Sequence, residues 1–284
     1  MSAVGDYVEL VRAPAALTVW GDTVAGAAAA GKPLSGKRML LPVSSVAFYW
    51  AGMAINDWAD RGLDAVERPE RPIPSGRISP GAALATGVAL TAAGVGTAAF
   101  AGGRRALRVA VPLAVAVWAY DTVLKRTAAG PFGMAACRVL DVLLGAHAPG
   151  RASWAAAALG VHTLGVTALS TGEVHGTAPA TARTALAGTG TAAAITLAGA
   201  SGSPVRRIAA VAAGAMYAQV VGTAQLAAAR DPRARVVRRA TAAGIHGMVP
   251  LQSALAARGS LSAAAAVASA LPVARALSRK VSPT

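Results

Sequence analysis

Apolar runs of about twenty residues recur from one end of the chain to the other, separated by short basic or Pro- and Gly-containing segments. A run of this length can cross the hydrocarbon core of a bilayer as a helix. Of the 284 residues, 55% are hydrophobic and only 14% are charged, which is less charge than the surface of a soluble protein demands. The pattern predicts an all-α polytopic transmembrane bundle that forms a single domain over residues 1–284.

The apolar runs divide the chain into nine expected spans, or ten. The number stays open because the run at 240–257 is only weakly apolar. Alanine and glycine dominate the runs, and small residues let helix backbones approach closely, which suits a compact bundle. The expected spans are 8–30, 39–57, 80–101, 105–124, 133–148, 153–172, 181–200, 206–229, 240–257 and 260–277.

Lys and Arg outnumber Asp and Glu by 27 to 12, and they are spread over the segments between the spans. No single basic face with interleaved aromatic residues is present, so we expect no nucleic-acid partner. The segments after the even-numbered spans hold more basic residues than those after the odd-numbered ones, twelve against nine. By the positive-inside rule we expect a multi-pass protein of the plasma membrane whose N-terminus faces the cytoplasm. Cys137 is the only cysteine, which excludes an intrachain disulfide.

Five of the twelve acidic residues fall within fourteen positions directly after the second apolar run. Charge at the end of a membrane span is costly, so it needs a reason. Asn56, Asp60 and Asp64 are four residues apart, and a helix places their side chains on one face, with Asp57 within reach of it. Oxygen ligands at this spacing suit Mg²⁺, which is commonly shared between carboxylates and substrate phosphates. A solvated helix end is the alternative interpretation.

An arginine-rich loop follows the acids. Residues 68–77 read Arg-Pro-Glu-Arg-Pro-Ile-Pro-Ser-Gly-Arg, and the prolines prevent a helix from continuing through them. A diphosphate carries several negative charges, which Mg²⁺ together with Lys or Arg neutralises. Because the acids and the arginines follow one another directly, the stretch favours a metal–diphosphate site on the cytoplasmic side over a solvated helix end.

Three motifs in this chain resemble the signatures of one family, the UbiA superfamily of intramembrane prenyltransferases. Their order and spacing agree with that family over roughly residues 10–180, and their wording is most similar to its EboC-like branch. The motifs are Asn56-Asp-x-x-Asp60-x-x-x-Asp64 with Arg68-Pro-x-Arg71-Pro-Ile-Pro-Ser-Gly, then Tyr120-x-x-x-x-Lys125-Arg126, then Arg138-x-x-Asp141-x-x-x-Gly145.

The resemblance implies a nine-helix bundle that opens laterally to lipid. It also implies Mg²⁺-dependent transfer of an isoprenyl group from an isoprenyl diphosphate to a small aromatic or lipid-like acceptor within the membrane. The donor, a hydrophobic acceptor and membrane lipid would be its partners. Asp60, Asp64 and Lys125 would be catalytic. By carry-over, the metal ligands would be Asn56, Asp57, Asp60 and Asp64, and the diphosphate contacts Lys125, Arg71, Arg126, Tyr120 and Arg138.

Two parts of this resemblance leave alternatives open, namely the role of Arg138 and the acidic residues of the sixth helix. Arg138 can equally form an ion pair with Asp141 that only holds the bundle. The family's sixth helix usually carries two aspartates four apart, whereas this chain has Glu173 as its single carboxylate there. Glu173 would replace the pair as a catalytic residue and metal ligand, helped by His175, since carboxylate and imidazole both bind divalent metals.

Two other functions compete with the prenyltransferase interpretation. The first is a catalytically lapsed UbiA relative that binds or helps to transport a prenylated metabolite, which the reduced sixth-helix motif would explain. The second is a CDP-alcohol phosphotransferase, which also uses spaced aspartates in a membrane helix. No Asp-Gly-x-x-Ala-Arg sequence precedes the acids, which argues against the phosphotransferase.

Overall fold

The computed structural model describes residues 3–146, 149–198 and 203–269, and within these ranges the chain is helical and has no strand. This confirms the predicted all-α fold class. Short 3-10 helices lie at η1 (Ala13–Thr18), η2 (Gly36–Leu40) and η3 (Leu124–Arg126). The α-helices are α1 (Ala3–Leu10), α2 (Trp20–Ala29), α3 (Leu41–Glu67), α4 (Pro80–Thr122), α5 (Gly130–Gly145), α6 (Pro149–Ser170), α7 (Pro179–Ala198), α8 (Pro204–Arg230) and α9 (Ala234–Ala257).

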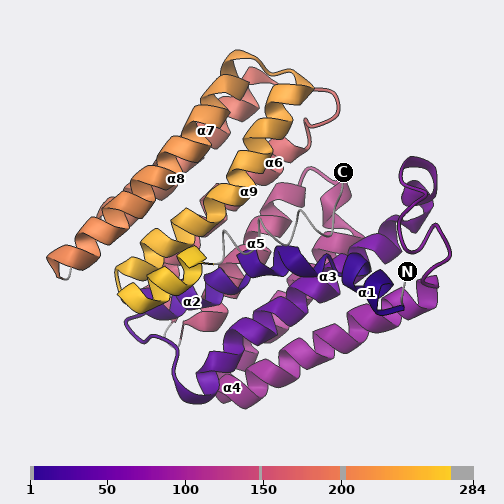
Figure 1. Cartoon of the computed structure of the whole chain (residues 1–284), viewed down its shortest axis with the longest axis horizontal. Helices are drawn as coiled ribbons and strands as arrows, with labels where there is room; N and C mark the ends of the chain where they lie inside the picture. The colour runs from indigo at the N-terminus through magenta and orange to yellow at the C-terminus, as the bar shows by residue number, and fades with distance from the viewer. Residues whose placement is uncertain (1–2, 147–148, 199–202, 270–284) are drawn as a thin grey trace.

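Consecutive long helices from α3 to α9 pack side by side, and α9 returns to pack against α2 and α6. Figure 1 shows the result as two groups, with α1 to α5 in one and α6 to α9 in the other. The short helix α2 lies between the groups because it contacts α3, α5 and α9. Glycine permits this crossing: a Cβ atom at Gly26 or Gly145 would collide with the backbone carbonyl of Val142 or Thr23.

Four helical segments in the described part of the chain are long and apolar enough to cross a membrane, judged by length and composition. They are Gly36–Glu67, Pro80–Thr122, Gly150–Ser170 and Pro204–Arg230. Large apolar side chains on α4 and α8 point outward, among them Phe100, Val115 and Ile208, each more than half exposed. Such outward apolar surface is what a bilayer covers. The protein is therefore embedded in the membrane, as the apolar runs predict.

One expected span was wrong, and one expected break was confirmed. The run 8–30 is not one span, because the backbone turns left-handed at Arg12 (φ 48°) before the 3-10 helix that contains Pro14. The expected break between the runs 80–101 and 105–124 is confirmed: Trp118 Nε1 donates to Thr91 Oγ1 at 3.1 Å, whereas residues 27 apart in one continuous helix would be about 40 Å apart. The two halves of α4 are separate helices that meet where Gly103 adopts φ 61° and ψ −150°. Only glycine adopts such a conformation readily. Of the run 260–277, residues 261–269 are helical, and residues 270–277 lie outside the described residues.

The loops gather at the two ends of the bundle. We call the end that carries the C-terminal half of α3, the loop 68–79, η3 and the loop 171–178 the acidic end, and the other the opposite end. Figure 1 shows the C-terminal part of α3 and the α6–α7 connection on the same side of the molecule. At the opposite end, Arg38 from η2 donates to the Gly145 carbonyl at the end of α5, at 2.9 Å.

Buried polar contacts tie four helices together inside the bundle. Arg138 on α5 forms an ion pair with Asp22 on α2, with Nε and Oδ2 2.9 Å apart. Gln252 on α9 donates to the other oxygen of Asp22 at 2.6 Å. Asp141 instead accepts a hydrogen bond from Ser45 on α3. The alternative of a bundle-holding ion pair for Arg138 is therefore realised, but its partner is Asp22.

Candidate active site

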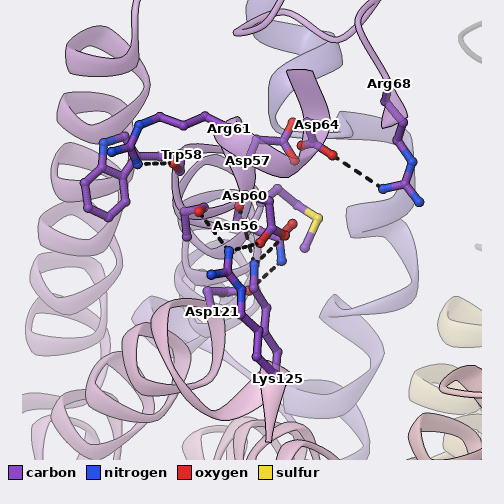
Figure 2. A network of polar contacts seen from close by, with 12 residues as sticks. Asn56, Asp57, Trp58, Asp60, Arg61, Asp64, Arg68, Asp121 and Lys125 are labelled. Carbon is purple, nitrogen blue, oxygen red and sulfur yellow. Dashed lines mark hydrogen bonds and ion pairs between the residues drawn. The ribbon is translucent and has the colours of Figure 1, made fainter. Parts of the chain in front are cut away.

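The acidic face of α3 is built as the sequence spacing predicts. The helix continues unbroken to Glu67, so Asn56, Asp60 and Asp64 follow one another at one-turn intervals. Asp57 and Asp64 are buried, 4% and 1% exposed, and the Asp60 side chain is 18% exposed. Figure 2 shows these side chains gathered with Lys125 and Asp121. Carboxylates this buried in a membrane protein require cationic partners or metal ions.

Asp60 is held by two cations from the α4–α5 connection. The ammonium of Lys125 lies 2.6 Å from one carboxylate oxygen, and the guanidinium of Arg126 lies 2.7 Å from the other. Lys125 also approaches the main-chain carbonyl of Asn56 at 3.4 Å. The 3-10 turn η3 positions both cations, since it begins directly after α4 ends and brings Leu124–Arg126 back over α3. The structure thus brings together the first two motifs of the sequence.

Asp57 and Asp64 share a third cation from the loop 68–79. Arg71 Nη1 lies 2.7 Å from Asp64 Oδ2 and 3.4 Å from Asp57 Oδ1. Arg68 contacts the second oxygen of Asp64 at 3.6 Å from a half-exposed position. Asp57 is also paired with Arg12, at 2.8 Å. The acidic face therefore carries two adjoining sets of contacts, one around Asp60 with Lys125 and one around Asp57 and Asp64 with Arg71. We call the two sets together the acidic network.

The loop 68–79 folds back on itself so that Arg71 can reach α3. The Ile78 amide donates to the Pro72 carbonyl at 2.9 Å, and Gly76 takes φ 75°. Arg77 fastens this loop to α1, with its guanidinium 2.7 Å from both Asp6 and Glu9. Hydrogen bonds to Glu9 and Asp6 raise the pKa of Arg77, so the clamp stays charged. The arginine-rich loop is thus an ordered part of the site.

Two residues of the network were not predicted as site residues. Asp121, which follows Tyr120 in the second motif, accepts a hydrogen bond from the Asn56 amide at 3.0 Å and is buried. Arg12 reaches Asp57 from a position 45 residues earlier in the chain. The only sequence signal for Asp121 is its spacing of four from Lys125. Because the side-chain nitrogen of Asn56 donates to Asp121, the side-chain oxygen is the atom of Asn56 that can act as an acceptor.

A cavity of about 110 Å³ lies between α3, α4 and α5 below this network. Tyr120 and Asp121 line its wall near the acidic end, and Arg138 and Asp141 line it deeper in the bundle. Most of the remaining wall is apolar, from Phe48, Val117 and neighbouring side chains. The predicted site residues Tyr120 and Arg138 therefore reach the same cavity, but Arg138 does so from its ion pair with Asp22.

Glu173 and His175 lie at the acidic end but in a different setting. Both are in the loop after α6, where Glu173 is partly buried and His175 is exposed. This loop contacts α9 and the residues just before it: Arg238 donates to the Glu173 carbonyl at 3.2 Å, and the Thr177 amide donates to the Pro232 carbonyl at 3.0 Å. Within the described ranges, no group of three or more His, Cys, Asp or Glu side chains is arranged to hold a metal ion.

Fold and site together define a class: a helical membrane protein with a network of carboxylates and cations at one end of a largely apolar cavity. Comparison with known proteins makes this specific. The sequence profile of the UbiA prenyltransferase family matches residues 16–171, which is more than half of the chain. The chain belongs to the UbiA prenyltransferase family.

Individual relatives agree with this assignment. Digeranylgeranylglyceryl phosphate synthase of Methanopyrus kandleri is 41% identical over 125 residues, which cover 43% of this chain and 44% of that protein. The chain thus spans less than half the length of the curated relatives it matches. Two solved structures share the fold. A UbiA homologue from Aeropyrum pernix has a TM-score of 0.65 and 19% identity, covering 83% of this chain and 95% of its own. One from Archaeoglobus fulgidus, bound to GPP and Mg²⁺, has a TM-score of 0.61 and 14% identity, covering 86% and 99%.

Proposed function

We propose that this protein transfers an isoprenyl group from an isoprenyl diphosphate to a small acceptor within the membrane, with Mg²⁺ as cofactor. The observation that carries the proposal is the network of Asp60 and Asp64 with Lys125 and Arg71, placed at the end of an apolar cavity. A diphosphate needs cations, and an isoprenyl chain needs an apolar, water-free space. Both are available within one site.

The chemistry of the donor set fits Mg²⁺. Carboxylate and amide oxygens are its usual protein ligands, and it commonly completes its shell with water and substrate phosphate. Asn56, Asp57, Asp60 and Asp64 would hold the metal. Asp60 and Asp64 are ion-paired with Lys125 and Arg71. These carboxylates would therefore bind a metal ion that arrives together with a diphosphate, because the diphosphate can replace them as the partner of both cations. When bound, Mg²⁺ supplies positive charge to the departing diphosphate.

The cationic residues would bind and orient the diphosphate. Lys125, with Arg71 and Arg126, would exchange carboxylate oxygens for phosphate oxygens, and Tyr120 at the cavity wall would contact the same group. The bond between the allylic C1 carbon and its bridging oxygen breaks, and the electron pair leaves with the diphosphate. These cations stabilise the charge that develops there. The acceptor nucleophile then bonds to C1 and gives up its proton, while the apolar walls exclude water.

The relatives support a lipid-like acceptor. The digeranylgeranylglyceryl phosphate synthases that match this chain are named for a glyceryl phosphate lipid. Their name does not point to the EboC-like branch, so assignment to that branch rests on the motif wording alone. We further propose that residues 1–284 form a single domain in the plasma membrane. Its acidic end would face the cytoplasm, where a water-soluble metal ion and diphosphate can enter.

The test is release of diphosphate by the purified full-length chain. The protein in detergent is incubated with radiolabelled geranylgeranyl diphosphate and a membrane lipid extract, with Mg²⁺ or with excess EDTA. We expect diphosphate release and a new labelled lipid with Mg²⁺, and a loss of both with EDTA that added Mg²⁺ restores. Release that is unaffected by EDTA would contradict the metal-dependent mechanism.

A second candidate function is a catalytically lapsed relative that binds a prenylated metabolite. The observation in its favour is the sixth-helix motif: Glu173 is its only carboxylate, and its loop contacts the start of α9. Such a protein would bind geranylgeranyl diphosphate without releasing diphosphate, and the assay above separates the two functions.

Replacing Glu173 with glutamine is expected to lower diphosphate release by about 100-fold, because the change removes the charge of the one carboxylate in the sixth-helix motif. Asp231→Asn is the matched control, since Asp231 is at the same end and pairs with Arg233 two residues away. Activity of the Glu173→Gln protein equal to that of the control would assign Glu173 to structure alone.

A further inference from the structure

A second cavity, of about 230 Å³, lies at the opposite end of the bundle, away from the acidic network. Its wall includes three arginines: Arg38 from η2, and Arg105 and Arg108 from α4. Nothing in the proposed transfer reaction uses this end of the molecule. We propose that the cavity binds the phosphate group of an anionic membrane phospholipid, whose acyl chains lie along the adjoining apolar surface.

Main-chain carbonyl groups hold the guanidinium group of Arg38 in place. Arg38 donates to the Gly145 carbonyl at 2.9 Å and to the Lys32 carbonyl at 3.3 Å, which leaves other N–H groups of its planar fork for a ligand. Arg105 and Arg108 are three residues apart on α4, so they share one face. They follow the break at Gly103, where the left-handed glycine starts the second half of the helix.

The described residues that line this cavity include three arginines and no Asp or Glu. Guanidinium groups in a cavity without acidic lining residues are suited to bidentate binding of phosphate oxygens.

The apolar part of the wall favours a lipid as the source of the phosphate. Leu41, Val109 and Leu144 line the cavity beside the arginines. Outward-facing apolar side chains lie close in sequence on the same elements, including Met39 (59% exposed) and Phe100 (61% exposed). A free phosphate ion would gain nothing from these carbons, whereas a phospholipid matches the arginines with its headgroup and the apolar surface with its chains.

The test compares lipids and variants in native mass spectrometry of the detergent-purified chain. Phosphatidylglycerol and phosphatidylcholine with identical acyl chains are titrated at one salt concentration, because charged contacts are screened by salt. Arg105→Gln/Arg108→Gln removes two cavity charges. Arg206→Gln/Arg207→Gln removes the same charge at the start of α8, outside the cavity. We expect the cavity variant to bind phosphatidylglycerol about tenfold more weakly and the control to bind it as the wild type does.

Each outcome decides the proposal. Undiminished phosphatidylglycerol binding by the cavity variant would overturn it, and so would an equal loss in both double variants, which would indicate general charge attraction. Inorganic phosphate is added separately in a thermal-unfolding assay. If it protects the wild type as well as phosphatidylglycerol does, the lipid is not the ligand. Equal unfolding midpoints of wild type and variants in phosphatidylcholine show that the fold is retained. The test is independent of whether the protein is an enzyme.

Discussion

An Asp60→Asn variant is expected to release diphosphate from geranylgeranyl diphosphate at least about 100-fold more slowly than the wild type, at saturating Mg²⁺. Asparagine keeps the size of the side chain but removes its charge and one strong metal-binding oxygen. Asp60 is also the shared partner of Lys125 and Arg126, at 2.6 and 2.7 Å. The change therefore weakens the metal site and releases both diphosphate-binding cations from their positions.

The chain supplies a matched control for Asp60→Asn on the same helix. Glu67 is exposed at the C-terminal end of α3, and its replacement by glutamine removes the same charge from the same end of the molecule. Donor binding is measured with and without Mg²⁺ in both variants. We expect Mg²⁺-dependent binding to disappear in Asp60→Asn and to persist in Glu67→Gln. Equal binding in the two variants would remove Asp60 from the metal site.

The acidic face of α3 was predictable because it depends only on local geometry. Spacings of four place Asn56, Asp60 and Asp64 on one side of any helix, and α3 is helical through all three. The partners of these acids were harder to predict from the sequence. Lys125 and Arg71 came from a family resemblance, whereas Arg12 pairs with Asp57 across 45 residues. That pairing depends on how η1 packs against α3, which no local pattern encodes.

The expected spans failed where single residues override hydropathy. The run 8–30 is apolar enough to predict one helix, but Arg12 and Pro14 break it into α1, η1 and α2. The pairing of Arg138 with Asp22 was missed for the same reason: only the broken first run places α2 against α5 and α9. Hydropathy measures the tendency to enter a membrane and says little about continuity within it.

Lys125→Met is expected to slow diphosphate release by at least about 100-fold, and Arg126→Gln by much less. Both side chains contact the carboxylate of Asp60, so a comparison of the two variants shows the effect of burying the cation. The Lys125 side chain is 11% exposed and that of Arg126 is 56% exposed. The less exposed pair costs more to break, because little solvent can replace the lost ammonium at Asp60, whereas an exposed pair contributes less than about 1 kcal/mol.

The two variants also separate binding from chemistry. If Lys125 stabilises the departing diphosphate, Lys125→Met lowers kcat and kcat/KM together, since that contact strengthens as the C–O bond breaks. If it only recruits the donor, KM rises and kcat is unchanged. Because the ammonium lies between Asp60 and the Asn56 carbonyl rather than at the open surface, we expect the fall in kcat. Single-turnover measurements at saturating donor check it, and a pure KM effect would make Lys125 a recruitment residue.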